Sequence, residues 1–324
     1  MTEKVKLGLV GTGHMGQYHV NVAVGMEPYE IVGICDANAE QLQTVAERFD
    51  LKAYSDFEVM LAEVDAVAIA VPTVLHFEIA RKALEAGKHV LVEKPITTSV
   101  AQAEELVHIA ESKQLVLQVG HIERFNGAVL ELGKVVSEPY LIESRRLAPF
   151  NKRISDVGVV LDLMIHDIDI ILNLVSKPVK SVHARGSSVF SKHEDYAAAT
   201  IHFEGGCVAN IVASRVTQTK IRRLSISQKN AFILQDFATQ DIEIHRQASS
   251  AYLMTREELK YKQESFIEHV AVHRDNPLRQ EHQHFVDTIR GKCSSIVSPQ
   301  EELRTLKIAS DILQDVQKNL IVVG

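Results

Sequence analysis

Lys6-Leu7-Gly8-Leu9-Val10-Gly11-Thr12-Gly13-His14-Met15-Gly16 is the segment that specifies the fold. An apolar run of strand character leads into a glycine-rich turn, and a helix is predicted from about His14 to Gly25. A second apolar strand, Glu30–Cys35, ends at Asp36, twenty residues past Gly16. A Gly-x-Gly-x-x-Gly turn between strand and helix, with an acidic residue at this distance, predicts a site for a dinucleotide.

The residue types of this segment also predict which dinucleotide binds. The glycines allow a tight turn and let backbone N–H groups approach a pyrophosphate, whose negative charge the helix N-terminus favours. Asp36 would accept hydrogen bonds from the adenosine ribose and repel a 2′-phosphate, and no Arg or Lys lies between Asp36 and Arg48. We therefore predict NAD as the cofactor. The residues predicted to bind it are Gly11, Gly13, His14, Met15, Gly16, Asp36, Val71, Pro72, Thr73, His76, Glu93 and Lys94. For His76, a place on a helix surface is an equal alternative to a cofactor contact.

The first 120 residues continue this alternation of apolar strands and amphipathic helices, which predicts a parallel sheet covered on both faces. Further strands are predicted at 65–71, 89–92 and 115–119, and further helices at 38–49, 74–86 and 99–112. We predict an α/β protein whose N-terminal domain, residues 1–121, is a doubly wound Rossmann sheet.

After Gly120 the pattern changes to a strict period-two alternation from Val179 to about His245. Glu204-Gly205-Gly206 and Lys229-Asn230 are typical of hairpin turns. Residues 122–324 are therefore predicted to form an α+β domain with a large, mainly antiparallel sheet that is open on one face. Its helices are predicted at 125–135, 159–174, 278–290 and 299–317, and a strand at 140–146.

Composition limits the classes of function. The chain has 324 residues, enough for two domains, and its formal charge of -7 argues against binding to nucleic acid. No apolar run approaches the length that spans a membrane, and the N-terminus has no signal-peptide core. Three widely spaced cysteines favour reduced thiols in a cytoplasmic protein. The scattered histidines do not predict a metal site.

Glu93-Lys94-Pro95 follows the apolar strand 89–92 and therefore lies at the carboxyl end of a parallel strand, where this fold binds its ligands. Proline holds the backbone of Lys94 away from the helical region. An ammonium group fixed there can donate a hydrogen bond to a reacting hydroxyl and stabilise an alkoxide. Lys94 is thus a predicted catalytic residue, with a surface lysine beside Glu93 as the alternative.

Asp162 and His166 lie four residues apart on the predicted helix 159–174 and so share one face. A histidine is the usual general base near neutral pH, and Asp162 would position the substrate or tune His166. Taken alone, Asp162 would be interpreted as an ordinary acidic residue of a helix, and His166 as an ordinary, partly buried histidine. Together with Lys94 and the cofactor motif, they are predicted to be catalytic and to contact the substrate.

These three motifs resemble the glucose–fructose oxidoreductase / inositol dehydrogenase (Gfo/Idh/MocA) family. The resemblance rests on the glycine-rich turn, Glu93-Lys94-Pro95 and the helix with Asp162 and His166, and it extends over nearly the whole chain. It implies that Lys94, Asp162 and His166 act on a sugar or cyclitol hydroxyl. It also implies that the open face of the second sheet mediates oligomerisation, as a homodimer or homotetramer.

Two further segments, 119–126 and 144–150 followed by Asp156-Val157-Gly158-Val159, resemble the UDP-N-acetylglucosamine 3-dehydrogenase branch of this family. Arginines can bind a diphosphate through paired hydrogen bonds, although a surface ion pair is the alternative for each one. The arginines predicted to meet a diphosphate are Arg124, Arg145, Arg146 and Arg153.

The sequence therefore predicts a cytoplasmic NAD-dependent dehydrogenase of a sugar, with a nucleotide sugar as the preferred substrate. His166 would take the hydroxyl proton while hydride leaves the same carbon. One alternative is a free-sugar or cyclitol dehydrogenase of the same fold. A second is a non-catalytic NAD-sensing regulator, which would have no need for Lys94, Asp162 and His166.

Overall fold

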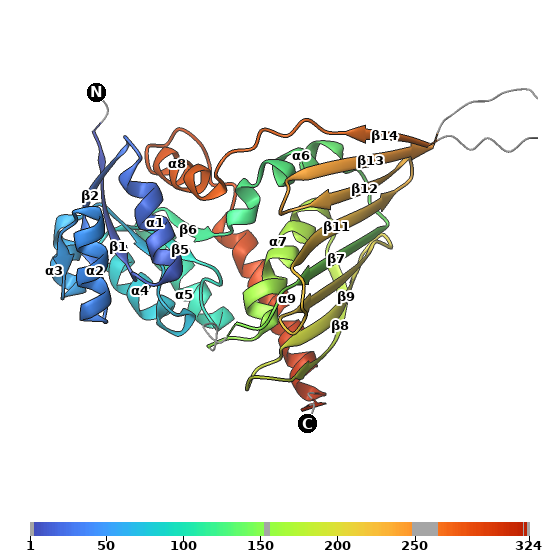
Figure 1. Ribbon diagram of the computed structural model, residues 1–324, viewed down its shortest axis with the longest axis horizontal. Helices are drawn as coiled ribbons and strands as arrows, with labels where there is room; N and C mark the ends of the chain where they lie inside the picture. The colour runs from blue at the N-terminus through green and yellow to red at the C-terminus, as the bar shows by residue number, and fades with distance from the viewer. Residues whose placement is uncertain (1–2, 152–155, 248–264, 320, 323–324) are drawn as a thin grey trace, which may run out of the picture.

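The computed structural model describes residues 3–151, 156–247, 265–319 and 321–322. Figure 1 shows a smaller sheet with helices around it near the N-terminus and a larger sheet that forms one side of the molecule. Three helices lie on the side of the large sheet that faces the smaller one (Figure 1): α6 (Gly127–Val135), α7 (Ile165–Leu174) and α9 (Pro299–Lys318).

The smaller sheet has the strand order β3-β2-β1-β4-β5-β6, and its pairings are parallel. In this doubly wound order the chain changes direction between β1 and β4, which opens a crevice at the carboxyl ends of the strands. Leu7, Val67 and Val92 are fully buried, because helices cover both faces. The predicted parallel α/β domain is confirmed. Its strands are β1 (Val5–Val10), β2 (Tyr29–Cys35), β3 (Ala53–Tyr54), β4 (Ala66–Ile69), β5 (His89–Glu93) and β6 (Leu117–Gly120).

Two helices of this domain begin at a side-chain cap. The side chain of Asn38 accepts a hydrogen bond from Gln41 at the start of α2, and Asp56 caps α3 in the same way. The helices are α1 (His14–Val24), α2 (Ala39–Phe49), α3 (Phe57–Glu63), the short η1 (Thr73–Leu75), α4 (His76–Glu85) and α5 (Val100–Ser112).

The large sheet has nine strands among the described residues, in the order β14-β13-β12-β11-β7-β10-β9-β8-β15. The period-two prediction is confirmed in β9, where Ala197, Ala199 and Ile201 are buried against the helices while Tyr196 and Ala198 face outwards. Pairings β7–β10 and β8–β15 are parallel, and the others are antiparallel. Its strands are β7 (Leu141–Leu147), β8 (Val179–Ser188), β9 (Tyr196–Phe203), β10 (Val208–Ser214), β11 (Ile221–Gln228), β12 (Ala231–Asp236), β13 (Asp241–Gln247), β14 (Ser265–His269) and β15 (Ile321–Val322).

The chain returns to the first domain near its end. Helix α8 (Pro277–Ile289) packs on α1, and its Phe285 and Val286 are buried in the same apolar cluster as Leu7 and Leu9. This helix thus completes the Rossmann layer, although it lies far beyond the predicted boundary at 121/122. The division of the chain at that point stays a prediction.

None of the helices in the described parts of the chain combines the length and the apolarity that crossing a bilayer requires.

Candidate active site

A cavity of about 450 Å³ lies at the carboxyl ends of β1, β2 and β4. It coincides with the crevice at which doubly wound sheets bind their ligands. Residues predicted to bind NAD line this space from three separate loops. They are Gly11, Gly13, Asp36, Val71 and Pro72.

The glycine-rich turn can accept a dinucleotide pyrophosphate. A Cβ atom on Gly16 would lie 1.9 Å from the carbonyl oxygen of Gly11, so only glycine permits this close turn. A Cβ on Gly13 would meet no protein atom within 4 Å, which leaves space beside the backbone. No side chain caps the N-terminus of α1, whose free N–H groups and dipole favour an anion. The residues present therefore fit NAD.

Asp36 is held beside this turn. Its Oδ2 accepts hydrogen bonds from the backbone N–H and the hydroxyl of Thr12, and its Oδ1 accepts one of 2.8 Å from the N–H of Asn38. These contacts fix the carboxylate at the rim of the 450 Å³ cavity. Its contact with a ribose hydroxyl stays a prediction.

Lys94 and Asp162 are brought together from the two domains. The Nζ of Lys94 donates hydrogen bonds to the backbone oxygen of Asp162, at 2.7 Å, and to its Oδ1, at 3.1 Å. Lys94 follows β5, and Asp162 lies on η3 (Val160–Met164), a π-helical turn that precedes α7. Such turns occur often at functional sites because they reorient the side chains of a helix. Both side chains keep about a sixth of their surface exposed, so a substrate can reach them.

His166 lies in the first turn of α7, four residues after Asp162, which binds Lys94. Burial first, and then the positive charges of Lys94 and Arg146, hold the pKa of His166 well below its ordinary value. The imidazole is therefore neutral near pH 7 and able to accept a proton. Its Nδ1 is buried without a hydrogen-bond partner among the described residues. An orphaned acceptor or donor of this kind is rare in native interiors, and it marks His166 as a group available for a ligand.

Two residues predicted to contact the cofactor have their side chains engaged elsewhere. His76 is buried, with Nδ1 2.8 Å from the oxygen of Pro95 and Nε2 2.9 Å from that of Val71, so it joins the loops after β4 and β5. The alternative of a helix-surface position does not hold for His76. Glu93 is also buried, and its Oε1 is paired with His19 at 2.8 Å. Cofactor contacts of Thr73, His14 and Met15 stay predictions.

The predicted substrate arginines are not gathered at the crevice. Arg124 donates two hydrogen bonds to Asp169, and Arg146 donates two to Asp167, at 2.6–2.9 Å, within the interior. Arg145 points to the outer face of the large sheet, because neighbouring residues of a strand alternate in direction. Arg153 lies outside the described residues. We therefore propose no direct substrate contact for Arg124, Arg145 or Arg146.

The carboxylates that hold these arginines were not predicted. Asp167 and Asp169 follow His166 directly and are almost fully buried, and Glu123 also accepts a hydrogen bond of 2.9 Å from Arg146. Acidic residues inside an apolar helix such as Ile165-His166-Asp167-Ile168-Asp169-Ile170 are a signal for buried ion pairs, since an unpaired buried charge is very unfavourable. These pairs anchor the helix that carries His166.

Comparison with known proteins agrees with this geometry. Residues 5–121 match the model of the GFO/IDH/MocA oxidoreductase family with its NAD-binding Rossmann fold, and residues 131–233 match the GFO/IDH/MocA C-terminal domain. UDP-N-acetylglucosamine 3-dehydrogenase from Acidithiobacillus ferrooxidans is 34% identical over 83% of this chain and 90% of its own length. Its solved structure has a TM-score of 0.88, with 31% identity over 97% of this chain and 98% of the other.

Two more distant proteins are also similar. An NAD-dependent scyllo-inositol 2-dehydrogenase from Bacillus subtilis is 26% identical over 67% of this chain and 69% of its own length. The WlbA dehydrogenase from Bordetella pertussis shares the fold, with a TM-score of 0.82 and 19% identity over 98% of this chain and 97% of the other. From the matches of both domains and the placement of Lys94, Asp162 and His166, we conclude that this chain belongs to the GFO/IDH/MocA family of NAD-dependent oxidoreductases.

Proposed function

We propose that the protein oxidises the 3-hydroxyl of UDP-N-acetylglucosamine to a ketone, with NAD as the hydride acceptor. The observation that carries the proposal is the pairing of Lys94 with Asp162, four residues before His166, at the carboxyl end of β5 in the parallel sheet. The choice of substrate is supported by the relative from A. ferrooxidans, which this chain matches over most of its length.

The residues of this chain divide the chemistry between them. Neutral His166 accepts the proton of the reacting hydroxyl, and Lys94 donates a hydrogen bond to the same oxygen as negative charge develops there. Asp162 holds the ammonium group of Lys94 in place. When bound, the nicotinamide ring of NAD takes the hydride from the carbon. One proton and one hydride leave the alcohol, and a ketone remains.

A sugar or cyclitol without a nucleotide is the second candidate, because the inositol dehydrogenase from B. subtilis is similar in sequence over 67% of this chain. A regulator that only senses NAD is a weaker candidate. Such a protein gains nothing from a lysine bound to an aspartate that lies four residues before a neutral histidine.

We expect UDP-N-acetylglucosamine to reduce NAD in the presence of this protein, whereas N-acetylglucosamine alone does not. Contacts to the non-reacting uridine diphosphate position the sugar, so the free sugar should lose kcat as well as affinity. The assay measures NADH formation with a coupled aminotransferase or a ketone trap, which removes an unfavourable product. If inositol or a free hexose is turned over well and the nucleotide sugar gives no trapped ketone, the second candidate replaces the first.

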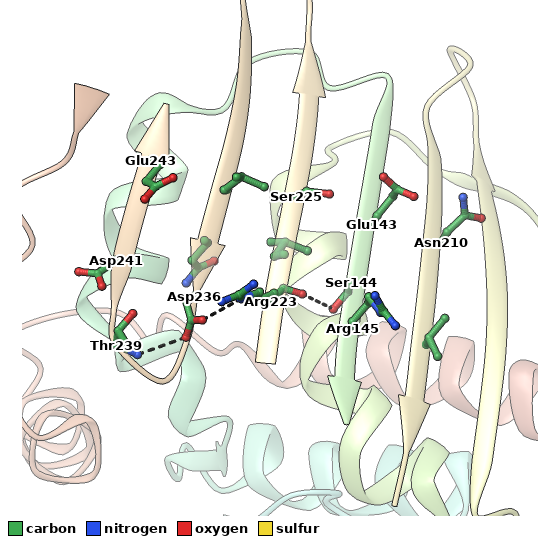
Figure 2. Close-up of a pocket in the computed structure, with 14 residues that line it drawn as sticks. Glu143, Ser144, Arg145, Asn210, Arg223, Ser225, Asp236, Thr239, Asp241 and Glu243 are labelled. Atoms are coloured by element: carbon green, nitrogen blue, oxygen red, sulfur yellow. Dashed lines mark hydrogen bonds and ion pairs between the residues drawn. The ribbon is translucent and has the colours of Figure 1, made fainter. Parts of the chain in front are cut away.

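We further propose that the protein is cytoplasmic and that it forms a homodimer or homotetramer through the outer face of the large sheet. Figure 2 shows this face, where Glu143, Arg145, Asn210 and Arg223 line a depression of about 840 Å³. A broad, uncovered sheet face with paired charges and amides can be complementary to the same face of a second copy of the chain. Light scattering at micromolar concentration should report a dimer or tetramer, and a stable monomer would contradict this assembly.

A further inference from the structure

Arg222 stands directly opposite Arg146 on the neighbouring strands β11 and β7. Like charges in opposite positions of a sheet repel each other. The charge of Arg146 is neutralised by Asp167 and Glu123, which accept its hydrogen bonds. The guanidinium of Arg222 only approaches Glu123, at 3.7 Å, and donates no hydrogen bond to any residue that the structure describes.

A second cation lies beside it. Lys220 directly precedes β11, is exposed, and forms no ion pair within the described parts of the chain. Lys220 lies two residues before Arg222, so their side chains leave the extended chain on the same side, and the positive charge of Arg222, ahead of burial, lowers the pKa of Lys220. Two neighbouring cations without a full partner form a site of surplus positive charge, which we call the Arg222 site.

The Arg222 site lies next to the helix that carries His166. Arg222 stands opposite Arg146, whose guanidinium binds Asp167, the residue after His166, and both arginines approach Glu123, at 2.9 and 3.7 Å. Among the described residues, Lys94 is paired with Asp162, and Arg146 with Asp167 and Glu123, whereas Arg222 only shares Glu123 and Lys220 has no ion pair. The Arg222 site thus lacks a carboxylate of its own, and the side chain of Arg222 keeps 36% of its surface exposed.

We propose that Arg222, assisted by Lys220, binds the diphosphate of the substrate. The planar guanidinium matches two oxygens of a phosphate, and the lysine adds a second charge next to it. This inference rests on the proposed function, because a nucleotide sugar supplies the diphosphate. It places the anion on β11, whereas the arginines of the sequence prediction are buried in ion pairs or face away.

The test is the binding of UDP to the NAD-loaded protein, measured by calorimetry. Arg222→Gln should raise the Kd for UDP by about 10–100-fold, the usual effect of losing hydrogen bonds to a charged group. Arg222→Lys should restore only part of the affinity, since it keeps the charge without the planar fork. Uridine, which has no phosphate, should not distinguish the variants.

Lys292→Gln is the matched control. Lys292 is also a cation, but it follows α8, its side chain is 54% exposed, and it pairs with Asp287 at 2.9 Å. This variant should bind UDP like the wild type. If Arg222→Gln fails to fold, as judged by lost NAD binding, Lys220→Gln at an exposed position should still weaken UDP binding severalfold.

The outcomes separate this inference from the proposed function. Turnover of UDP-N-acetylglucosamine with no effect of Arg222→Gln or Lys220→Gln on UDP binding would overturn the inference and leave the function standing. UDP binding that depends on Arg222, without turnover of that sugar, would support the inference and overturn the function. A wild-type protein with no measurable affinity for UDP would overturn the Arg222 site.

Discussion

Lys94→Ala and His166→Ala are each expected to lower kcat by about 10²–10⁴-fold, the usual effect of losing a positioned acid–base group. Lys94→Ala removes the donor that stabilises the alkoxide, and His166→Ala removes the neutral base. NAD affinity should change little, because the glycine-rich turn and the free N-terminus of α1 lie on other segments. Steady-state kinetics and NAD titration measure both quantities.

The double variant sharpens this result. Residues that act on the same proton transfer are strongly non-additive, so the variant lacking both groups should be about as slow as the slower single variant. Lys82→Ala and His108→Ala are suitable controls, since both side chains are exposed on helices of the N-terminal domain and their loss should leave kcat normal. A near-normal kcat for either catalytic variant would show that its residue has no such role.

Arg146→Leu is expected to lower the free energy of unfolding by about 3–5 kcal/mol, which is the effect of breaking a buried ion pair by removing one partner. Arg146 is 1% exposed, and its loss leaves the carboxylates of Asp167 and Glu123 buried without their cation. Urea unfolding followed by circular dichroism compares the variant with the wild type.

Arg279→Leu provides the control. Arg279 is exposed on α8, and its replacement should change stability by less than about 0.5 kcal/mol. Adding Asp167→Asn to Arg146→Leu should recover part of the lost stability, since one uncompensated charge is removed. Equal effects of Arg279→Leu and Arg146→Leu would contradict the buried network.

Much of the architecture could be predicted because its signals are local. The turn at 11–16 specifies strand, glycine loop and helix within one short segment, and burial of near-continuous apolar strands requires helices on both faces. The hairpins at Gly205 and Gly206, both with positive φ, and at Lys229-Asn230 were predicted from turn chemistry. The short β3 and α3 (Phe57–Glu63) were missed, because elements of two and seven residues are too short to show a clear hydrophobic period.

The amino-acid sequence alone was enough to predict the two sheets and the dinucleotide crevice, because each depends on periodicity or on a strand ending at a known edge. The catalytic roles of Lys94, Asp162 and His166 stay predictions, although Lys94 does contact Asp162. Which charged residues pair with each other became visible only in the tertiary structure. Arg124 and Arg146 lie 45 and 21 residues from the aspartates that bind them, and His282 on α8 reaches His19 across 263 residues. An arginine in a sequence has no visible partner, since pairing depends on which faces of distant strands and helices are brought together. Arg146 and Arg222 lie opposite each other only in the folded sheet, where Asp167 and Glu123 neutralise Arg146 and Arg222 keeps 36% of its side chain exposed.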